Sequence, residues 1–457
     1  MTPALAIARA AGRISRGLGR GGGTSLPGKV LLRMRPGAVG ELASSLPHGV
    51  ALISATNGKT TTSRLVAGAV RCAGWRPVAN PSGANLLSGV ATALLENAGR
   101  AADIGLFEVD EAALPAVAAQ ARPRVILLMN LFRDQLDRYG ELEAIAERWA
   151  AMIAALPPET RVVVNADDPA VCALARDRPG SVLFGLEDPA AALAELPHAA
   201  DSTRCRRCSA ELLYDHVFLG HLGHWRCPSC GDARPQPDVR AVAVGLDGMR
   251  GVDLELATPA GRIAARVGIP GVTAAYNAAA AAACALALGV EPEAVRRALQ
   301  ETRAAFGRGE WVELGGRRAV LLLAKNPTGA NETIRTVLLE DGPVDLVMAL
   351  NDRTADGHDV SWIWDVDVEP LVPRLGRLTL TGERAHDLAL RFRYAGLDAA
   401  RMTVEPDLDR ALDHALAGGD RDRVLHVLPT YTAMLDLRAL LVRRGAADHF
   451  WRDGAGA

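Results

Sequence analysis

The stretch ISATNGKTTT, residues 53–62, places a glycine, a lysine and hydroxyl side chains in the order found in phosphate-binding loops. Backbone N–H groups around Gly58 would face phosphates at the start of a helix. The Lys59 ammonium would reach the β- and γ-phosphates, and the Thr60 hydroxyl would coordinate Mg²⁺. The standard loop has a glycine where this chain has Ile53. These residues therefore predict a nucleotide site of a variant kind.

Four cysteines form a second group with clear chemistry. Their spacing is C-x2-C-x18-C-x2-C, and they are Cys205, Cys208, Cys227 and Cys230. Two such knuckles bring four thiolates into a tetrahedron around Zn²⁺, so we predict a closed, structural zinc ribbon. The three histidines between the knuckles are not expected to be ligands. The insert lacks the basic and aromatic stripe of nucleic-acid binders, so no nucleic-acid partner is expected.

Lysine is rare in this chain, where Lys and Arg together number 51. It occurs at positions 29, 59 and 325. A lysine that persists against this bias is expected where a forked guanidinium cannot replace a compact ammonium. We therefore predict a function for Lys59 and for Lys325 of LLLAKNPTG, the latter beside an acyl phosphate or a substrate carboxylate.

The elements that position these residues follow from the pattern after residue 50. Short apolar strands such as GVALISAT, ADIGLFEVDE and PRVILLMNL alternate with helical segments such as ELEAIAERWAAMIAAL. This rhythm predicts an α/β fold with a mostly parallel sheet and helices on both faces. Ligands of such sheets bind at the carboxyl ends of the strands. The loop, Glu108 and Asn130 all fall there.

Six motifs carry a family resemblance. They are TNGKTT, FEVDE, NLFRDQLDRYG, NADDP, AAYNAAAAAA and FGRGEW, in that order. Together they resemble the ATP-binding central domain of the Mur ligases and folylpolyglutamate synthases. The resemblance implies that ATP phosphorylates a carboxylate and that an amine then attacks the acyl phosphate to give an amide. One departure is Ala55, where the family usually has a glycine, which suggests a position that needs a positive φ.

The same resemblance implies the residues of the ATP site. Glu108 and the Thr60 hydroxyl would hold Mg²⁺, and Asn277 would contact the adenine. Arg308 of GRGE would lie at the junction with the last domain. The complete set expected to bind ATP is Asn57, Gly58, Lys59, Thr60, Thr61, Asn277 and Arg308.

The last third of the chain, with LLLAKNPTGANET and VMALNDRTADGHDVSWIWDVDVE, resembles the C-terminal domain of the MurT family. These are the ligase-like subunits of lipid II isoglutaminyl synthases, and the four-cysteine insertion is similar to theirs. The resemblance implies three parts: a basic segment 1–45, an ATP-binding domain 46–305 with its insertion at about 201–235, and an α/β domain 306–457. It also implies amidation of the D-glutamate α-carboxylate in the lipid II stem peptide.

Ammonia for such a reaction must come from elsewhere. Cys72, Cys172 and Cys284 are expected in helix cores, unlike a glutaminase nucleophile on a sharp turn. The resemblance implies a GatD-like class I glutamine amidotransferase partner, whose Cys–His pair would be completed by an aspartate of this chain. We choose Asp359 first, then Asp356, then Asp352. Trp362 and Trp364, just beyond, are expected to alternate on a strand.

The N-terminal segment is basic. Arg9, Arg13, Arg16 and Arg20 are spaced to share one helical face. Such a helix either rests on an anionic membrane or packs as a solvated N-terminal helix, with a transit peptide as a third alternative. The cysteine usage suits a reducing compartment, so we expect a cytoplasmic protein, either free or peripheral at the inner face of the plasma membrane.

The composition of the chain excludes few functional classes. A net charge of −2 over 457 residues favours no particular partner, and no apolar run reaches the about 18 residues of a membrane span. Three rival functions stay open: a stand-alone amino-acid ligase of the folylpolyglutamate type, another peptide ligase, and a non-catalytic zinc-ribbon binding module.

Overall fold

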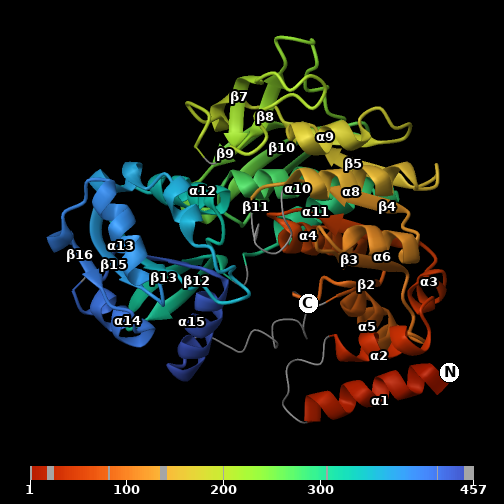
Figure 1. Ribbon diagram of the computed structural model, residues 1–457, viewed down its shortest axis with the longest axis horizontal. Helices are drawn as coiled ribbons and strands as arrows, with labels where there is room; N and C mark the ends of the chain where they lie inside the picture. Colours follow the sequence, from red (N-terminus) through yellow and green to blue (C-terminus); the bar gives the residue numbers. More distant parts are fainter. Residues whose placement is uncertain are drawn as a thin grey trace.

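The computed structural model of this chain describes residues 3–17, 25–80, 83–133, 142–198, 200–304, 307–418 and 420–446, and the side chains of 14–17 lie outside this description. Two α/β units lie side by side, each built on its own sheet (Figure 1). Residues 134–140 of the motif NLFRDQLDRYG fall outside the described residues. Within the described ranges, none of the helices combines the length and apolar character that crossing a bilayer requires.

The first sheet has nine strands among the described residues, in the order β11-β10-β9-β6-β5-β4-β1-β3-β2. Its strands are β1 Val50–Ser54, β2 Pro77–Ala79, β3 Ile104–Glu108, β4 Val125–Leu128, β5 Arg161–Asn165, β6 Val182–Leu186, β9 Val239–Leu246, β10 Val252–Thr258 and β11 Gly261–Val267. The pairs from β2 across to β9 are parallel, whereas β10 and β11 add an antiparallel edge. The predicted mostly parallel sheet is confirmed.

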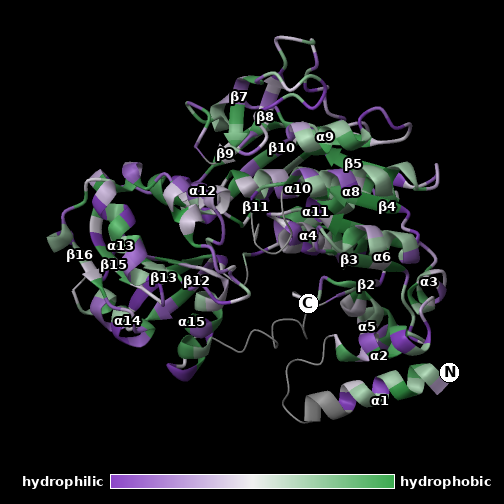
Figure 2. Cartoon of the chain, viewed as in Figure 1, coloured by the Kyte–Doolittle hydropathy of each residue, from purple (hydrophilic) through white to green (hydrophobic). Residues whose placement is uncertain are grey.

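Helices cover both faces of this sheet, as predicted. One face carries α4 Lys59–Cys72, α10 Val272–Leu288 and α11 Pro292–Glu301. The other carries α5 Leu87–Asn97, α6 Leu114–Ala121, α8 Leu142–Ala154 and α9 Pro169–Ala175. Alternate residues of β1 supply the two cores, so the central strands are apolar throughout. Figure 2 shows this hydrophobic character along β4 and β5.

The N-terminal segment forms α1 Pro3–Gly17, α2 Leu26–Met34 and α3 Ala38–Ala43. Helix α1 packs on α2 and α5 through a small core that includes Ala8, Leu31 and Leu95. The Arg9 guanidinium donates hydrogen bonds to the carbonyl oxygens of Leu95 and Ala98 at the end of α5. Helix α1 is therefore packed on one side, while its residues Ile7 and Arg13 are exposed. Arg16 and Arg20 lie outside the described side chains.

The second sheet has six strands among the described residues, in the order β12-β13-β17-β14-β15-β16. They are β12 Arg308–Leu314, β13 Arg317–Leu322, β14 Val344–Ala349, β15 Leu375–Thr381, β16 Met402–Val404 and β17 Leu425–Pro429. All pairs except β12–β13 are parallel. The covering elements are α12 Pro327–Leu338, α13 Ala385–Tyr394, α14 Leu408–Ala417, α15 Tyr431–Arg443, η3 Ser361–Asp365, η4 Glu369–Arg374 and η5 Ala399–Arg401.

An insertion between β6 and β9 forms the top of the molecule in Figure 1. It contains η1 Pro189–Ala191 and the antiparallel hairpin of β7 Leu213–Leu219 and β8 Leu222–Arg226, while η2 Gly248–Arg250 follows β9. One aromatic prediction was wrong: Trp362 and Trp364 lie on the 3-10 helix η3 and not on a strand. The Asp359 carboxylate accepts the Ser361 N–H at 2.8 Å and starts the turn.

Candidate active site and metal centre

The nucleotide loop, residues 55–58, connects the buried strand β1 to α4, as expected. Gly58 adopts φ 90° at the N-terminus of α4. A Cβ atom there would lie 2.2 Å from the Asn277 Oδ1 atom, so the position requires glycine for both conformation and space. Among described residues other than glycine, positive φ occurs at Arg122 and Ser209. The expectation that position 55 needs a positive φ was therefore wrong, and Ala55 fits there.

Asn277 lies within α10 and is 2% exposed. Its Oδ1 atom accepts a hydrogen bond from the Thr62 hydroxyl at 3.2 Å. The residue is thus held against the first turn of α4, next to Gly58, and is not a helix cap. The structure brings together the loop and a residue more than 200 positions away, as the family resemblance implied.

The Lys59 ammonium donates hydrogen bonds to the Ala55 carbonyl oxygen and to the Glu111 carboxylate, the latter at 2.8 Å. Lys59 and Glu111 are both largely buried. Glu111 was not among the predicted site residues, although the motif FEVDE offered a signal, since acids lie at and directly after the end of β3. The pair fixes the ammonium at the entrance to α4, where phosphates bind in loops of this kind.

Strand ends complete this side of the site. Glu108, the last residue of β3, is 8% exposed. Its backbone N–H donates a hydrogen bond to the Asn80 Oδ1 atom at 3.0 Å, and its carbonyl oxygen accepts one from Asn80 Nδ2 at 2.8 Å. Asn130 follows β4, and its amide exchanges two hydrogen bonds with the backbone of Asn57, at 2.9 and 3.0 Å. A carboxylate and an ordered loop therefore meet at one edge of the sheet.

The second unit contributes to the same place. The Arg308 guanidinium donates a hydrogen bond of 3.4 Å to the Thr61 hydroxyl, in the first turn of α4 beside the partly exposed Thr60. Burial lowers the pKa of Arg308, and the Glu108 carboxylate partly opposes this effect. Lys325 lies in the loop before α12, directly before Asn326, which is bonded to Asn57. Arg308 and Asn326 of the second unit thus contact the first turn of α4 and the nucleotide loop.

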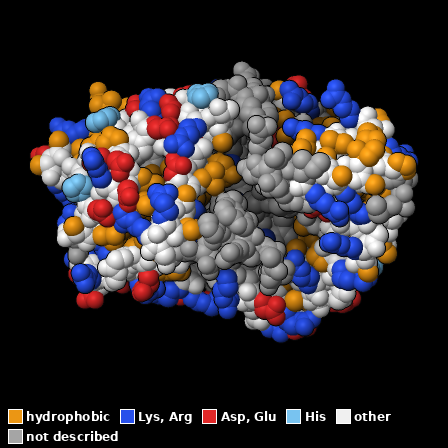
Figure 3. All heavy atoms as spheres, turned by 90° about the horizontal axis from the view of Figure 1, so that it is seen from below, with side chains coloured by type: hydrophobic (Ala, Val, Ile, Leu, Met, Phe, Trp, Pro, Cys, Tyr) orange, Lys and Arg blue, Asp and Glu red, His pale blue; other side chains and the backbone are white. Residues whose placement is uncertain are grey.

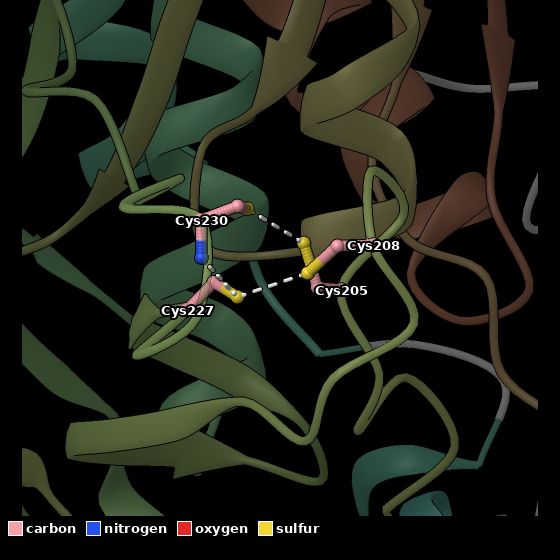
Figure 4. A group of neighbouring side chains, drawn as sticks. All are labelled: Cys205, Cys208, Cys227 and Cys230. Atoms are coloured by element: carbon pink, nitrogen blue, oxygen red, sulfur yellow. Dashed lines mark hydrogen bonds between the residues drawn. The ribbon is translucent and has the colours of Figure 1, made fainter.

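The four cysteines of the insertion converge, as the spacing predicted (Figure 4). Their sulfur atoms all lie within 4.8 Å of one another, so the group can hold a metal ion. Cys205 and Cys227 are buried, and Cys208 and Cys230 are exposed. The backbone N–H of Cys230 lowers the pKa of Cys227 to about 6, which favours a thiolate.

The insertion is fastened to the first unit beside this centre. The Trp225 indole donates a hydrogen bond to the Ala166 carbonyl oxygen at 3.0 Å. Cys172 of α9 packs against Trp225, Cys205 and Cys227. The histidines lie elsewhere, as expected: His221, for example, is fully buried with its ring 3.3 Å from the Asp168 carboxylate.

The three aspartates considered for the partner differ in their surroundings. Asp359 is exposed, and its hydrogen bond to Ser361 lowers its pKa. Asp356 is half-buried, which raises its pKa, and its carboxylate accepts the N–H and the hydroxyl of Thr432 at the start of α15. Asp352 forms an ion pair of 3.0 Å with Arg384. Asp359 is the aspartate of the three whose side chain is open to the surface.

The remaining cysteines are poor nucleophiles. Cys172 and Cys284 are buried in helices, and burial raises the pKa of each thiol to about 12. Cys72 is the last residue of α4 and is only partly buried. The expectation of a helix was right for Cys72, but the expectation of a core position was wrong. Burial and the neighbouring Glu301 carboxylate raise its pKa as well.

Two family models match this chain: Mur ligase middle domain over residues 53–216, and MurT ligase C-terminal over residues 323–434. The chain is 32% identical over 433 residues to the Streptococcus pneumoniae lipid II isoglutaminyl synthase (glutamine-hydrolyzing) subunit MurT, covering 93% of each chain.

Solved structures share the fold. A pseudomurein peptide ligase type C from Methanothermus fervidus has a TM-score of 0.68 at 20% identity, covering 86% of this chain and 78% of that chain. A Mycobacterium tuberculosis folylpolyglutamate synthase complexed with ADP and AMPPCP has a TM-score of 0.61 at 18% identity, covering 91% and 98%. Because the pneumococcal relative is 32% identical over 93% of each chain, and the MurT ligase C-terminal model matches the second unit, this chain belongs to the MurT family.

Proposed function

We propose that this chain is the ligase subunit of a lipid II isoglutaminyl synthase. It amidates the α-carboxylate of D-glutamate in the lipid II stem peptide, using ATP and ammonia. The observation that carries this proposal is the meeting of Lys59, Asn277 and Arg308 at the first turn of α4, in a chain of the MurT family. The activity is that named for the pneumococcal relative.

The reaction takes two steps. A carboxylate oxygen of the substrate attacks the γ-phosphorus of ATP, and ADP leaves. Ammonia then attacks the carbonyl carbon of the acyl phosphate, phosphate leaves, and the amide forms after loss of a proton. Backbone N–H groups from Gly58 to Thr61 and the Lys59 ammonium would bind the phosphates. Asn277 would contact the adenine, and Lys325 the acyl phosphate or the substrate carboxylate.

Mg²⁺ would be held by the Thr60 hydroxyl and the Glu108 carboxylate, both oxygen donors of the kind this ion prefers. When bound, it supplies charge neutralisation for phosphoryl transfer. Zn²⁺ is the ion we propose for the cysteine centre, because four thiolates close a tetrahedral structural site.

The ammonia would come from a GatD-like class I glutamine amidotransferase. Buried thiols of raised pKa support an external source, since glutaminase chemistry needs an accessible thiolate. The exposed carboxylate of Asp359 would enter the partner's active site and orient its histidine, as the third member of a triad does.

We also propose that the chain works at the cytoplasmic membrane surface, where a lipid-linked substrate resides. Ile7, Leu26 and Met34 of α1 and α2 are 50%, 43% and 45% exposed. Arg13 and Arg33 on the same helices are exposed as well. Figure 3 shows basic and hydrophobic side chains together on the face seen from below, the side on which α1 lies. Such a mixture favours an anionic bilayer surface.

The test combines the chain with a GatD-like partner, ATP, glutamine and lipid II, and measures ADP and amidated lipid II. With lipid II in detergent, Lys59→Ala should reduce ADP release to background, whereas Lys29→Ala should retain it. With lipid II in anionic vesicles, Arg13→Glu with Arg33→Glu should slow turnover, and detergent should restore it. No ADP release by the wild-type complex would refute the proposed activity.

A further inference from the structure

One contact between the two units lies directly on the nucleotide loop. The side-chain amides of Asn57 and Asn326 exchange two hydrogen bonds: Asn326 Nδ2 donates to Asn57 Oδ1 at 3.0 Å, and Asn57 Nδ2 donates to Asn326 Oδ1 at 3.3 Å. The two residues are 269 positions apart. Reciprocal pairing needs a donor and an acceptor on each side, which an amide provides.

Both members of this pair are fixed by other contacts. The Asn130 amide holds the Asn57 backbone on both sides. Asn326 is 1% exposed, and its Oδ1 atom also accepts the Gly329 N–H at 2.8 Å as the N-cap of α12. The pair therefore joins an ordered loop to an ordered helix end, and a displacement of one is transmitted to the other.

Helix α12 is docked on the first unit along its length. The Glu332 carboxylate accepts the Val272 N–H at the start of α10, at 2.6 Å. The Arg335 guanidinium donates to the carbonyl oxygens of Phe218 and Ala191, at 2.9 and 2.7 Å. Among the described contacts of α12, the Asn326 pair is the one that reaches the nucleotide loop, and it places Lys325 next to it.

We propose that Asn326 is a positioning residue of the ligase reaction, which sets the nucleotide loop through Asn57 when the two units are together. This inference rests on the proposed ATP-dependent function. ATP itself would bind to residues of the first unit for the most part, so Asn326 acts on the reacting geometry more than on affinity. Two hydrogen bonds of ordinary strength correspond to about a 5- to 100-fold change in kcat.

The structure offers a matched pair of variants. Asn326→Ser keeps an oxygen that can cap α12 but is too short to pair with Asn57. Asp407→Ser makes the same kind of change at the N-cap of α14, where Asp407 accepts the Arg410 N–H at 2.9 Å. We expect Asn326→Ser to lower kcat by about 5- to 100-fold, with the Kd of ATP by calorimetry changed less than about twofold. Asp407→Ser should leave both unchanged.

A double-mutant cycle tests the coupling: in an Asn57→Ser background, Asn326→Ser should cause little further loss. Hydrogen exchange of residues 55–62 supplies a readout without catalysis, and it should quicken in Asn326→Ser but not in Asp407→Ser. The exchange measurement separates a failure of this inference from a failure of the proposed activity.

Three results would each overturn the positioning role of Asn326. They are losses of kcat that multiply in the double-mutant cycle, a loss confined to ATP affinity, and unchanged kcat and exchange in Asn326→Ser.

Discussion

At the scale of single residues, the surroundings of the three aspartates in NDRTADGHD determine which of them a partner subunit can reach. Asp356 and Asp352 are each satisfied inside their own unit, by Thr432 and by Arg384. Asp359 is exposed, and one of its carboxylate oxygens accepts the Ser361 N–H in a local turn. A carboxylate that serves a neighbouring subunit must be reachable from outside, and Asp359 meets this condition.

Asp359→Asn should slow turnover driven by glutamine and spare turnover driven by free ammonium, because the triad acts only in releasing ammonia. Asp356→Asn is the contrasting variant. It weakens the cap of α15, so we expect a lower melting temperature and similar losses with either nitrogen source. Initial rates of ADP release with each source check both. Equal loss with the two sources in Asp359→Asn would remove it from the triad.

Spacing revealed some of the site residues but not their partners. The sequence placed Lys59 and Glu108 at strand ends because β-strand and loop patterns are local. Glu111 and Asn326 were not predicted, because each is distinguished only by a contact with a distant residue. Glu111 contacts Lys59, 52 positions away, and Asn326 contacts Asn57, 269 positions away. Local patterns cannot show which of several acids or amides a distant loop will meet.

At the scale of elements, the cysteine insertion was the most predictable part, because metal-ligand spacing is itself a geometric constraint. The contacts that hold the insertion against the first unit were not predictable. The Trp225 indole donates to a carbonyl oxygen of the loop after β5, and Cys172 of α9 packs in the small core of the insertion. The alternating apolar residues of VSWIWD suggested a strand. Instead, a local turn in which the Asp359 carboxylate accepts the Ser361 N–H leads into a 3-10 helix.

Removal of the metal should loosen this insertion and leave the first sheet folded. We expect one Zn²⁺ per chain by elemental analysis, and Cys205→Ser should abolish it, while Cys72→Ser outside the cluster should retain it. Cys205→Ser or a chelator should also lower the melting temperature, because the binding energy of a structural metal is folding energy. Full zinc content in Cys205→Ser would contradict the assignment of ligands.

At the scale of the whole molecule, the sequence predicted two α/β units but not how they meet. Helix α12 supplies one part of this junction: its Glu332 carboxylate accepts the Val272 N–H of α10, and its Arg335 guanidinium donates to the carbonyl oxygens of Phe218 and Ala191. Every position of α12 is buried or partly buried once the two units are together, because both units cover it. A docking surface of this kind becomes visible only when both units are in place.

Glu332 gives this junction a dependence on pH. Burial raises its pKa from 4.5 to about 7, although Arg335 and the N–H groups at the start of α10 oppose the shift. The docked state therefore keeps a proton that the unfolded state loses above about 4.5. Its contribution to stability is complete at lower pH and is lost as pH rises through about 7, amounting to about 3 kcal/mol.

Glu332→Gln should flatten this part of the pH dependence, because its side chain has no proton to lose and can still accept the Val272 N–H. Calorimetric melting temperatures from about pH 5 to about pH 8 should fall with rising pH in the wild type more steeply than in Glu332→Gln. Glu340→Gln is the matched control: Glu340 also accepts a backbone N–H across the junction, from Met249 at 2.7 Å, but it is only partly buried. It should keep the wild-type slope. Parallel slopes in the wild type and Glu332→Gln would show that this carboxylate is not the titrating group of the junction.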